Sequence, residues 1–199
     1  GEHGKLRAWL EILPVEFLYF DPLLTILRAY YLHSVGQQEQ GNHLLQEAER
    51  LRVSSAELSE EDRHKLLSSF EVIRGLIYTF TGDVPGMIKH SNQALELLPD
   101  DETTWRSLAA FILGDAYSYQ GDMTASYHAR SEALRICEAA GDTYYTIVAA
   151  LKLASTLKEQ GELQQTMELC QQQLQQANIY GYSQTGPVGC LMVLWGDVL

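Results

Sequence analysis

Few residues in this 199-residue chain have the types and the spacing that catalysis or metal binding requires. The three cysteines, Cys137, Cys170 and Cys190, lie far apart and form no Cys-x-x-Cys pair, so neither a structural zinc site nor a disulfide framework is predicted. The six histidines share no ligand spacing with one another or with the cysteines. We therefore expect no metal site at His3, His33, His43, His64, His90 or His128.

Carboxylates cluster at 60–62 and at 100–102. Both clusters precede expected helices, and the helix dipole favours negative charge at a helix start, so capping explains them better than acid–base catalysis. The phosphate-loop, zinc-protease, serine-hydrolase and dinucleotide-binding motifs do not occur in the sequence. We predict no catalytic residue, and the chain is not expected to be an enzyme.

A repeat organises the elements around these residues. Gly36, Gly82, Gly121 and Gly161 each end one apolar helical run and precede another, at intervals of 39 to 46 residues. Such a glycine suits the left-handed residue that follows a helix. A small residue also recurs seven positions before each of them, which predicts close approach of neighbouring helices: Ala29, Gly75, Gly114 and Ala154.

The second helix of each copy carries its own small residue, twelve positions after the glycine. Ala48, Ala94 and Ala133 occupy that position in the first three copies, and Gln173 takes it in the fourth. Two explanations remain open at this point. Either the fourth copy packs its second helix less closely, or its register slips.

The best copy reads Leu113-Gly114-x-Ala116-Tyr117-x-Tyr119-x-Gly121 and resembles the tetratricopeptide repeat. The resemblance implies an all-α fold, a right-handed superhelix of antiparallel helix pairs (an α-solenoid) with about ten helices. Apolar spacing and start signals predict helices near 5–12, 21–35, 38–52, 60–81, 84–98, 101–120, 123–140, 142–160, 163–178 and 184–199.

No linker rich in Pro, Gly or Ser separates the copies, so one repeat domain over 1–199 is expected. The polar 53–64 segment is interpreted as a loop between repeats, and an interdomain linker is the less favoured alternative. The chain reads as a fragment of a longer protein, whose apolar end faces allow self-association. Its expected parts are the end of a preceding repeat at 1–14, repeats near 21–52, 60–99, 101–140 and 142–178, and the first helix of a next repeat at 183–199.

The net charge of −12, from 14 basic and 26 acidic residues, argues against direct binding of nucleic acid, which needs basic residues to neutralise phosphates. No signal peptide is visible, and no apolar run approaches the length of a membrane span, so no membrane association is expected. Unpaired cysteines suit a reducing compartment, and a cytoplasmic location is predicted.

Motifs in the flanks carry a more specific resemblance. Trp9-Leu10-x-x-Leu13-Pro14, Asp21-Pro22-Leu23-Leu24 and the closing Gly186-Pro187 with Leu194-Trp195 are similar to the repeat region of MalT-like, LuxR-family ATP-dependent transcriptional activators. The resemblance implies a sensor that receives a small-molecule inducer or a regulatory protein. It also implies a parent protein with a separate ATP-binding module and a helix-turn-helix, while this fragment itself holds no cofactor.

In tetratricopeptide-like stacks the first helices line the concave groove. Carrying the groove positions onto this sequence gives aromatic side chains mixed with hydroxyl and charged groups, which would suit a small polar or amphipathic ligand. An ordinary solvated groove is the alternative. The candidate ligand- or partner-binding residues are Tyr30, His33, Thr79, Phe80, Asp115, Ser118, Tyr119, Ser155 and Lys158.

A general scaffold that binds peptide segments of partner proteins is the second hypothesis. Repeats that bind chaperone tails clamp a terminal carboxylate with Lys, Arg and Asn in the groove. The corresponding positions here hold Leu76, Asp115 and Ser155, which do not supply that clamp. The sensor hypothesis is therefore favoured.

Overall fold

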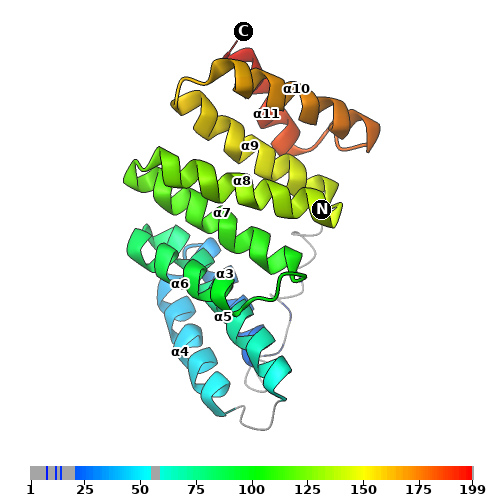
Figure 1. Cartoon of the computed structure of the whole chain (residues 1–199). Helices are drawn as coiled ribbons and strands as arrows, with labels where there is room; N and C mark the ends of the chain where they lie inside the picture. The colour runs from blue at the N-terminus through cyan, green and yellow to red at the C-terminus, as the bar shows by residue number, and fades with distance from the viewer. Residues whose placement is uncertain (1–7, 9–11, 13, 15–20, 55–58, 199) are drawn as a thin grey trace. The chain divides into compact units, whose positions relative to one another are not determined.

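The computed structural model describes residues 8, 12, 14, 21–54 and 59–198 (Figure 1). Within these ranges all regular secondary structure is α-helical, and nine helices run from α3 to α11. The expected all-α class, built of consecutive helix pairs, is confirmed. The helix expected near 5–12 and most of the 1–14 segment lie outside the described residues.

The chain divides into two compact units, one ending at Leu98 and the other beginning at Pro99. The first unit contains α3 (Pro22–Ser34), α4 (Gln38–Ser54), α5 (Glu60–Thr81) and α6 (Val84–Leu97). Helix α3 packs against α4 and α5, and α5 packs against α6. Fully buried side chains fill the core of this unit: Ile26, Ala29, Ala48, Phe70, Ile73, Met87 and Ala94.

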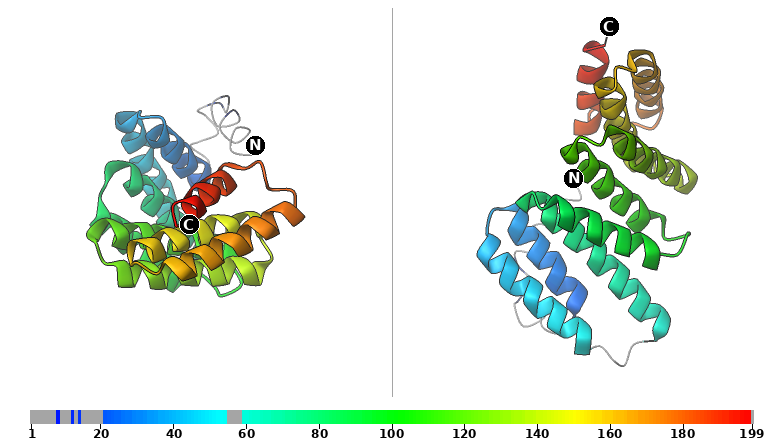
Figure 2. Two further views of the ribbon diagram at one scale, coloured as in Figure 1. Left: turned by 90° about the horizontal axis from the view of Figure 1, so that it is seen from above. Right: turned by 60° about the vertical axis from the view of Figure 1, so that its left-hand side comes forward.

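The second unit contains α7 (Thr103–Gln120), α8 (Met123–Ala140), α9 (Thr143–Glu159), α10 (Leu163–Ile179) and α11 (Gly186–Gly196). Each helix packs against the next, and α11 also contacts α9 (Figure 2). One cluster of buried residues joins α9, α10 and α11, and it is built from Ile147, Ala154, Cys170, Ala177, Val188 and Leu191.

Left-handed glycines end the first helix of every pair, as the sequence predicted. The four central glycines have φ values between +71° and +82°, where side chains other than glycine are strained. Gly141 and Gly181 adopt the same conformation after α8 and α10, although sequence reasoning did not single them out. The turns that contain these glycines are short, so the helices on either side of each one are antiparallel neighbours, whereas α4 and α6 end without such a glycine.

Aspartates beside these glycines start the following helices. Asp83, Asp122 and Asp142 each accept a hydrogen bond from the backbone N–H three residues ahead, at 2.9 to 3.0 Å. The expected capping by 100–102 is only partly correct. Glu102 occupies the N-cap of α7 but makes no side-chain capping bond, and the helix begins at Thr103 rather than at 101.

The small residues explain how closely the helices approach. Ala29, Ala154, Ala48, Ala94 and Ala133 are all fully buried. A Cβ atom added at Gly114 would lie 2.5 Å from Cγ of Arg130, a distance that requires something to move. The predicted crowding at Gly114 is therefore confirmed.

We expect only one of the three thiols to react rapidly with a thiol-specific reagent in the folded chain. Cys190 is exposed, whereas Cys137 and Cys170 are buried, and burial raises the pKa of both buried thiols. Titration with a chromogenic disulfide should show one fast equivalent, and two further equivalents should appear in denaturant. A Cys190→Ser variant should lose the fast phase. Rapid reaction of two thiols in the native chain would contradict the packing described here.

Candidate functional site

Two of the nine predicted groove residues form an aromatic pair in the first unit. Tyr30 on α3 and Phe80 on α5 have ring centroids 5.6 Å apart in a tilted arrangement. Phe80 remains 41% exposed, and burial of Tyr30 raises the pKa of its phenol. The pair thus joins neighbouring first helices, and the Phe80 side chain stays partly exposed to solvent.

Hydroxyl residues at the predicted positions are mostly engaged with their own helices. Thr79 donates a hydrogen bond to the backbone oxygen of Leu76 at 2.6 Å, and Ser155 donates one to Leu151 at 2.9 Å. Tyr119, near the end of α7, is 64% exposed. Its ring is the most accessible of the predicted aromatic groups, and Ser118 beside it is half-buried.

Asp115 does not stand free in a groove, because two cations bind it. The Lys152 ammonium lies 2.8 and 2.7 Å from its two carboxylate oxygens, and the Arg130 guanidinium lies 3.0 Å from one of them. Arg130 also donates to the backbone oxygen of Lys152 at 2.9 Å and to the hydroxyl of Thr156 at 2.6 Å. These four residues, hereafter the Arg130 cluster, connect α7, α8 and α9.

A hydroxyl pair lies directly beside the Arg130 cluster. The Ser126 hydroxyl donates to the backbone oxygen of Gly114 at 2.9 Å and lies 3.4 Å from the Thr156 hydroxyl. Arg130 is only 7% exposed, although its Nε has no hydrogen-bond partner among the described residues. Because a buried guanidinium needs a counter-charge, the Asp115 carboxylate is already engaged and is not a free acceptor for a ligand.

The Arg130 cluster was missed by sequence reasoning, although the repeat register held a signal. Arg130 stands nine residues after Gly121, and the same register holds Leu45, Ser91 and Cys170 in the other copies. A charged residue at an otherwise apolar or small position should have pointed to a buried ion pair. Gly114, with no side chain, gives the Arg130 stem the room it occupies.

Lys158 is likewise paired. Its ammonium lies 2.7 Å from a carboxylate oxygen of Asp197, the residue that follows α11, and both side chains remain partly exposed. Exposed pairs of this kind contribute little to stability and exchange readily with water. Lys158 therefore stays available to an anionic group that displaces Asp197.

His33 is buried instead of lining an open groove. It is 3% exposed, and neither of its ring nitrogens has a well-formed hydrogen bond among the described residues. Its imidazole rests on Gly41, where a Cβ would come within 2.6 Å of Cδ2. Burial lowers the pKa of His33, and contact with the Asn42 side chain acts in the opposite direction with a smaller effect.

Acidification is expected to destabilise the first unit through His33. The folded state lowers the pKa of His33 below its unfolded value, so the stabilising effect is complete above about pH 6.5 and is lost as the pH falls through the folded-state pKa. One proton limits the slope to about 1.4 kcal/mol per pH unit. Amide exchange in α3 and α4 at pH 7.5 and 5.5 measures the change.

A His33→Gln variant should show a smaller pH response in α3 and α4 than the native chain. His128→Gln, which alters an exposed histidine of α8, is the matched control and should leave that response unchanged. Equal responses in all three chains would show that His33 does not carry the effect.

Another buried histidine occupies the interface of α5 and α6. Nδ1 of His90 is hydrogen-bonded to the carboxylate of Glu71, and Tyr78 stacks on the imidazole at a centroid distance of 5.3 Å. Gly86 packs on the Tyr78 ring, which leaves no space for a side chain. This cluster is a hydrogen-bonded polar contact within the core.

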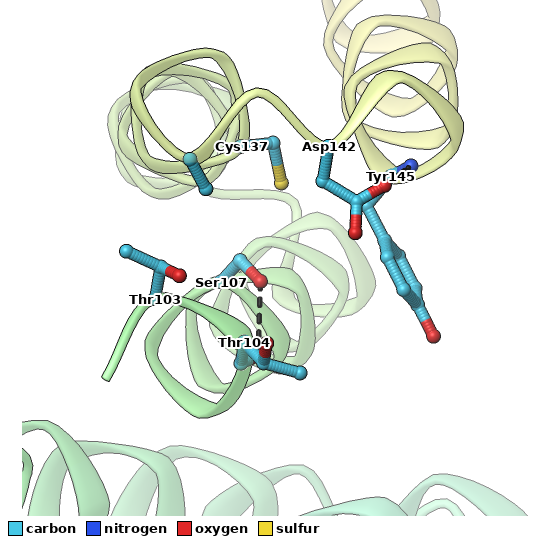
Figure 3. Close-up of a pocket in the computed structure, with 7 residues that line it drawn as sticks. Thr103, Thr104, Ser107, Cys137, Asp142 and Tyr145 are labelled. Carbon is cyan, nitrogen blue, oxygen red and sulfur yellow. Dashed lines mark hydrogen bonds between the residues drawn. The ribbon is translucent and has the colours of Figure 1, made fainter. Parts of the chain in front are cut away.

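Cavities in the second unit lie near the helix ends opposite Tyr119 and Lys158. One of them lies between Ser107, Cys137 and Asp142 (Figure 3), and its volume of about 20 Å³ leaves room for a single water molecule. A larger cavity of about 280 Å³ is lined in part by Arg106 and Arg135. None of the nine predicted groove residues lines these two cavities.

Two further observations limit the chemistry of the described residues. No group of three or more His, Cys, Asp or Glu side chains is arranged to hold a metal ion within them. No helix among them is long and apolar enough to cross a membrane.

The family model for the MalT-like TPR region matches residues 68–199. This match covers more than half of the chain, so the chain belongs to the MalT-like tetratricopeptide-repeat family. The family expected from the flanking motifs is thereby confirmed.

Curated relatives agree with this assignment. The chain is 26% identical over 168 residues to the HTH-type transcriptional regulator MalT of Cronobacter sakazakii and 26% identical to that of Klebsiella pneumoniae. Each alignment covers 84% of this chain but 18% of the relative. The chain thus spans less than a fifth of the length of these regulators.

Solved structures share the fold. The apo form of RapI aligns with a TM-score of 0.69 and 14% identity over 94% of this chain and 50% of that one. A signal-transduction ATPase with numerous domains and a tetratricopeptide-repeat sensor, from Pyrococcus horikoshii, aligns with a TM-score of 0.66 and 15% identity over 97% of this chain and 28% of that one. At such identities the likeness shows the helical-repeat fold alone.

Proposed function

We propose that this chain is the sensory and protein-interaction segment of a bacterial transcription regulator, and that it binds an inducer or a regulatory protein without chemically changing it. The family match over 68–199 carries the proposal, because the curated relatives of this segment are HTH-type transcriptional regulators. The longer protein would act in the cytoplasm and would bind ATP and DNA through other segments.

The surface features support binding rather than catalysis. The exposed ring of Phe80, paired with Tyr30, and the exposed ring of Tyr119 lie on first helices, where aromatic groups supply buried area to a ligand. The described residues show no nucleophile paired with a base at these positions. The net charge of −12 opposes direct contact with DNA by this segment.

A thermal-shift screen of small metabolites and candidate regulatory proteins tests the proposal. A true ligand should raise the melting temperature, because binding at about 100 times its Kd stabilises the folded state by about 2.7 kcal/mol. The small-molecule ligand should be recovered unchanged after incubation, as followed by NMR. Phe80→Ala and Tyr119→Ala, scored separately, should weaken the response of a ligand held by that ring.

Consumption of the ligand would overturn the non-catalytic part of the proposal. Failure of every small molecule, together with a shift by a regulatory protein, would remove the inducer and leave the protein partner. No response to either class in a folded sample would overturn sensing altogether.

The scaffold alternative is disfavoured by the Arg130 cluster. A carboxylate clamp needs several free cations in the groove, yet Lys152 and Arg130 are both held by Asp115, and Lys158 is the one lysine or arginine among the nine predicted groove residues. Binding of peptides that end in a free carboxylate, with loss of binding when the terminus is amidated, would restore this alternative.

A further inference from the structure

The fourth helix pair departs from the others at one buried position. Twelve residues after the turn glycine, the first three pairs carry an alanine with no exposed surface, and the fourth carries Gln173 at 2% exposure. The register does not slip, because Gly161 and Gly181 hold the same left-handed conformation as Gly121 and Gly141. The fourth helix pair therefore accommodates a longer polar side chain at the position where the other three pairs bury the methyl group of an alanine.

A cavity lies where this longer side chain enters the interface. It has a volume of about 290 Å³ and opens between the end of α8, the start of α9 and the C-terminal half of α10. This volume is close to the lower limit of small-molecule pockets. The lining residues are polar in type apart from Gly141, although their carbon atoms supply somewhat more of the lining surface than their polar atoms do: Glu138, Gly141, Thr143, Thr146, Gln172, Gln173, Gln176 and Tyr180.

Gln173, one of the residues that line this cavity, has an unsatisfied acceptor. Its Oε1 is buried and has no hydrogen-bond partner among the described residues. Leaving a buried acceptor unpaired is unfavourable, so a donor that reaches it gains more than an ordinary hydrogen bond. Rotation about the last torsion of a glutamine is soft, so the amide can turn its oxygen toward the cavity.

Charge indicates what kind of donor suits the cavity. Glu138 is the one charged group among the lining residues, and no lysine or arginine is among them. The segment from Pro99 onward is itself acidic, with 12 carboxylate residues against 5 lysines and arginines. A negative environment attracts cations and repels anions, and the Tyr180 ring adds a surface on which a cation can rest.

We propose that the cavity around Gln173 binds a small molecule through a protonated amino group, with Gln173 and Glu138 as the acceptors. The Thr143 and Thr146 hydroxyls and the Gln176 amide contact the rest of the ligand. The inference rests on and deepens the proposed function, since it gives the sensor an effector site whose lining does not include Tyr30, Phe80 or Tyr119.

Titration of the full chain with three isosteres tests the site. The probes are n-butylammonium, 1-butanol and butyrate, followed by NMR of the glutamine side-chain amides. We expect saturable shifts at Gln173 and Gln176 with the ammonium probe, weaker shifts with the alcohol and none with butyrate. Gln173→Ala should reduce affinity for the ammonium probe at least about tenfold, because it removes a hydrogen bond to a charged group.

Gln173→Ala should fold, because it restores the alanine of the other three pairs, and its melting curve verifies this. Gln171→Ala alters an exposed residue of the same helix that does not line the cavity, and it should bind like the native chain. Glu138→Gln should weaken binding of the ammonium probe and leave binding of 1-butanol unchanged.

Unchanged binding in Gln173→Ala, or no saturable binding of the ammonium probe to the native chain, would overturn the site. Equal binding of 1-butanol and n-butylammonium would overturn the charge assignment. Either failure leaves the proposed sensor intact if the thermal-shift screen finds another ligand. A third outcome is binding of the ammonium probe at this site, with no response in the thermal-shift screen and no effect of amines on transcription by the longer protein. That outcome would overturn the sensory role but not the binding site.

Discussion

Replacing Asp115 with alanine is expected to lower the free energy of unfolding by about 2 to 4 kcal/mol. The substitution removes the counter-charge of Arg130, which is 7% exposed, and the partner of the Lys152 ammonium. A buried guanidinium without its carboxylate keeps its desolvation penalty and loses the attraction that offset it. Denaturant unfolding monitored by circular dichroism measures the loss.

The matched control for this prediction is Glu132→Ala. Glu132 pairs with Arg135 on the exposed side of α8, where solvent screens the interaction, so little change is expected. A second comparison is Asp115→Ala combined with Arg130→Met, which removes the buried positive charge together with its counter-charge, keeps an apolar side chain of similar length at position 130, and should recover much of the stability. Equal effects of Asp115→Ala and Glu132→Ala would show that the Arg130 cluster is solvated.

Gly114→Ala is expected to destabilise the chain by about 1 to 3 kcal/mol, despite the better helix propensity of alanine. The new Cβ would lie 2.5 Å from Cγ of Arg130, near the base of that side chain. Arg130 cannot simply withdraw, because its guanidinium is held by Asp115 and Thr156. Thermal and denaturant unfolding measure the change.

Gly189→Ala provides the opposite control within the same unit. Gly189 lies inside α11, and an added Cβ would meet no atom within 4 Å. The same substitution should there stabilise the chain by up to about 1 kcal/mol through helix propensity alone. If the two substitutions changed stability in the same direction, close packing at Gly114 would not be the reason for its glycine.

The helices were predictable because each is marked by local chemistry. Turns and caps depend on contacts between residues a few positions apart, so they can be predicted directly from sequence. This holds for the central glycines and for Asp83, Asp122 and Asp142. The error at 100–102 has the same origin, since three neighbouring carboxylates compete for one cap and sequence alone does not choose among them. Helix α7 accordingly begins two residues later than expected.

The candidate site was less predictable, because side-chain partners come from other helices. Position in the repeat correctly predicted that Tyr30 and Phe80 lie close together, because the positions that face the groove follow from helix geometry alone. It did not reveal that Asp115 and Lys158 are paired, because their partners lie 15 to 39 residues away in sequence. It also did not reveal that His33 is buried, because this depends on how closely the next helix approaches at Gly41. Gln173 was visible as a departure from the repeat, but the cavity beside it required the packing of three helices.

The left-handed glycines at 121, 141, 161 and 181 are evenly spaced by 20 residues, one helix and its turn. Loss or gain of a single 20-residue block would reverse the direction of every helix that follows, whereas a 40-residue block would restore it. Lengthening of this array by gene duplication should therefore proceed in whole hairpins, and the Gly141-Asp142 junction is a natural seam for such an insertion.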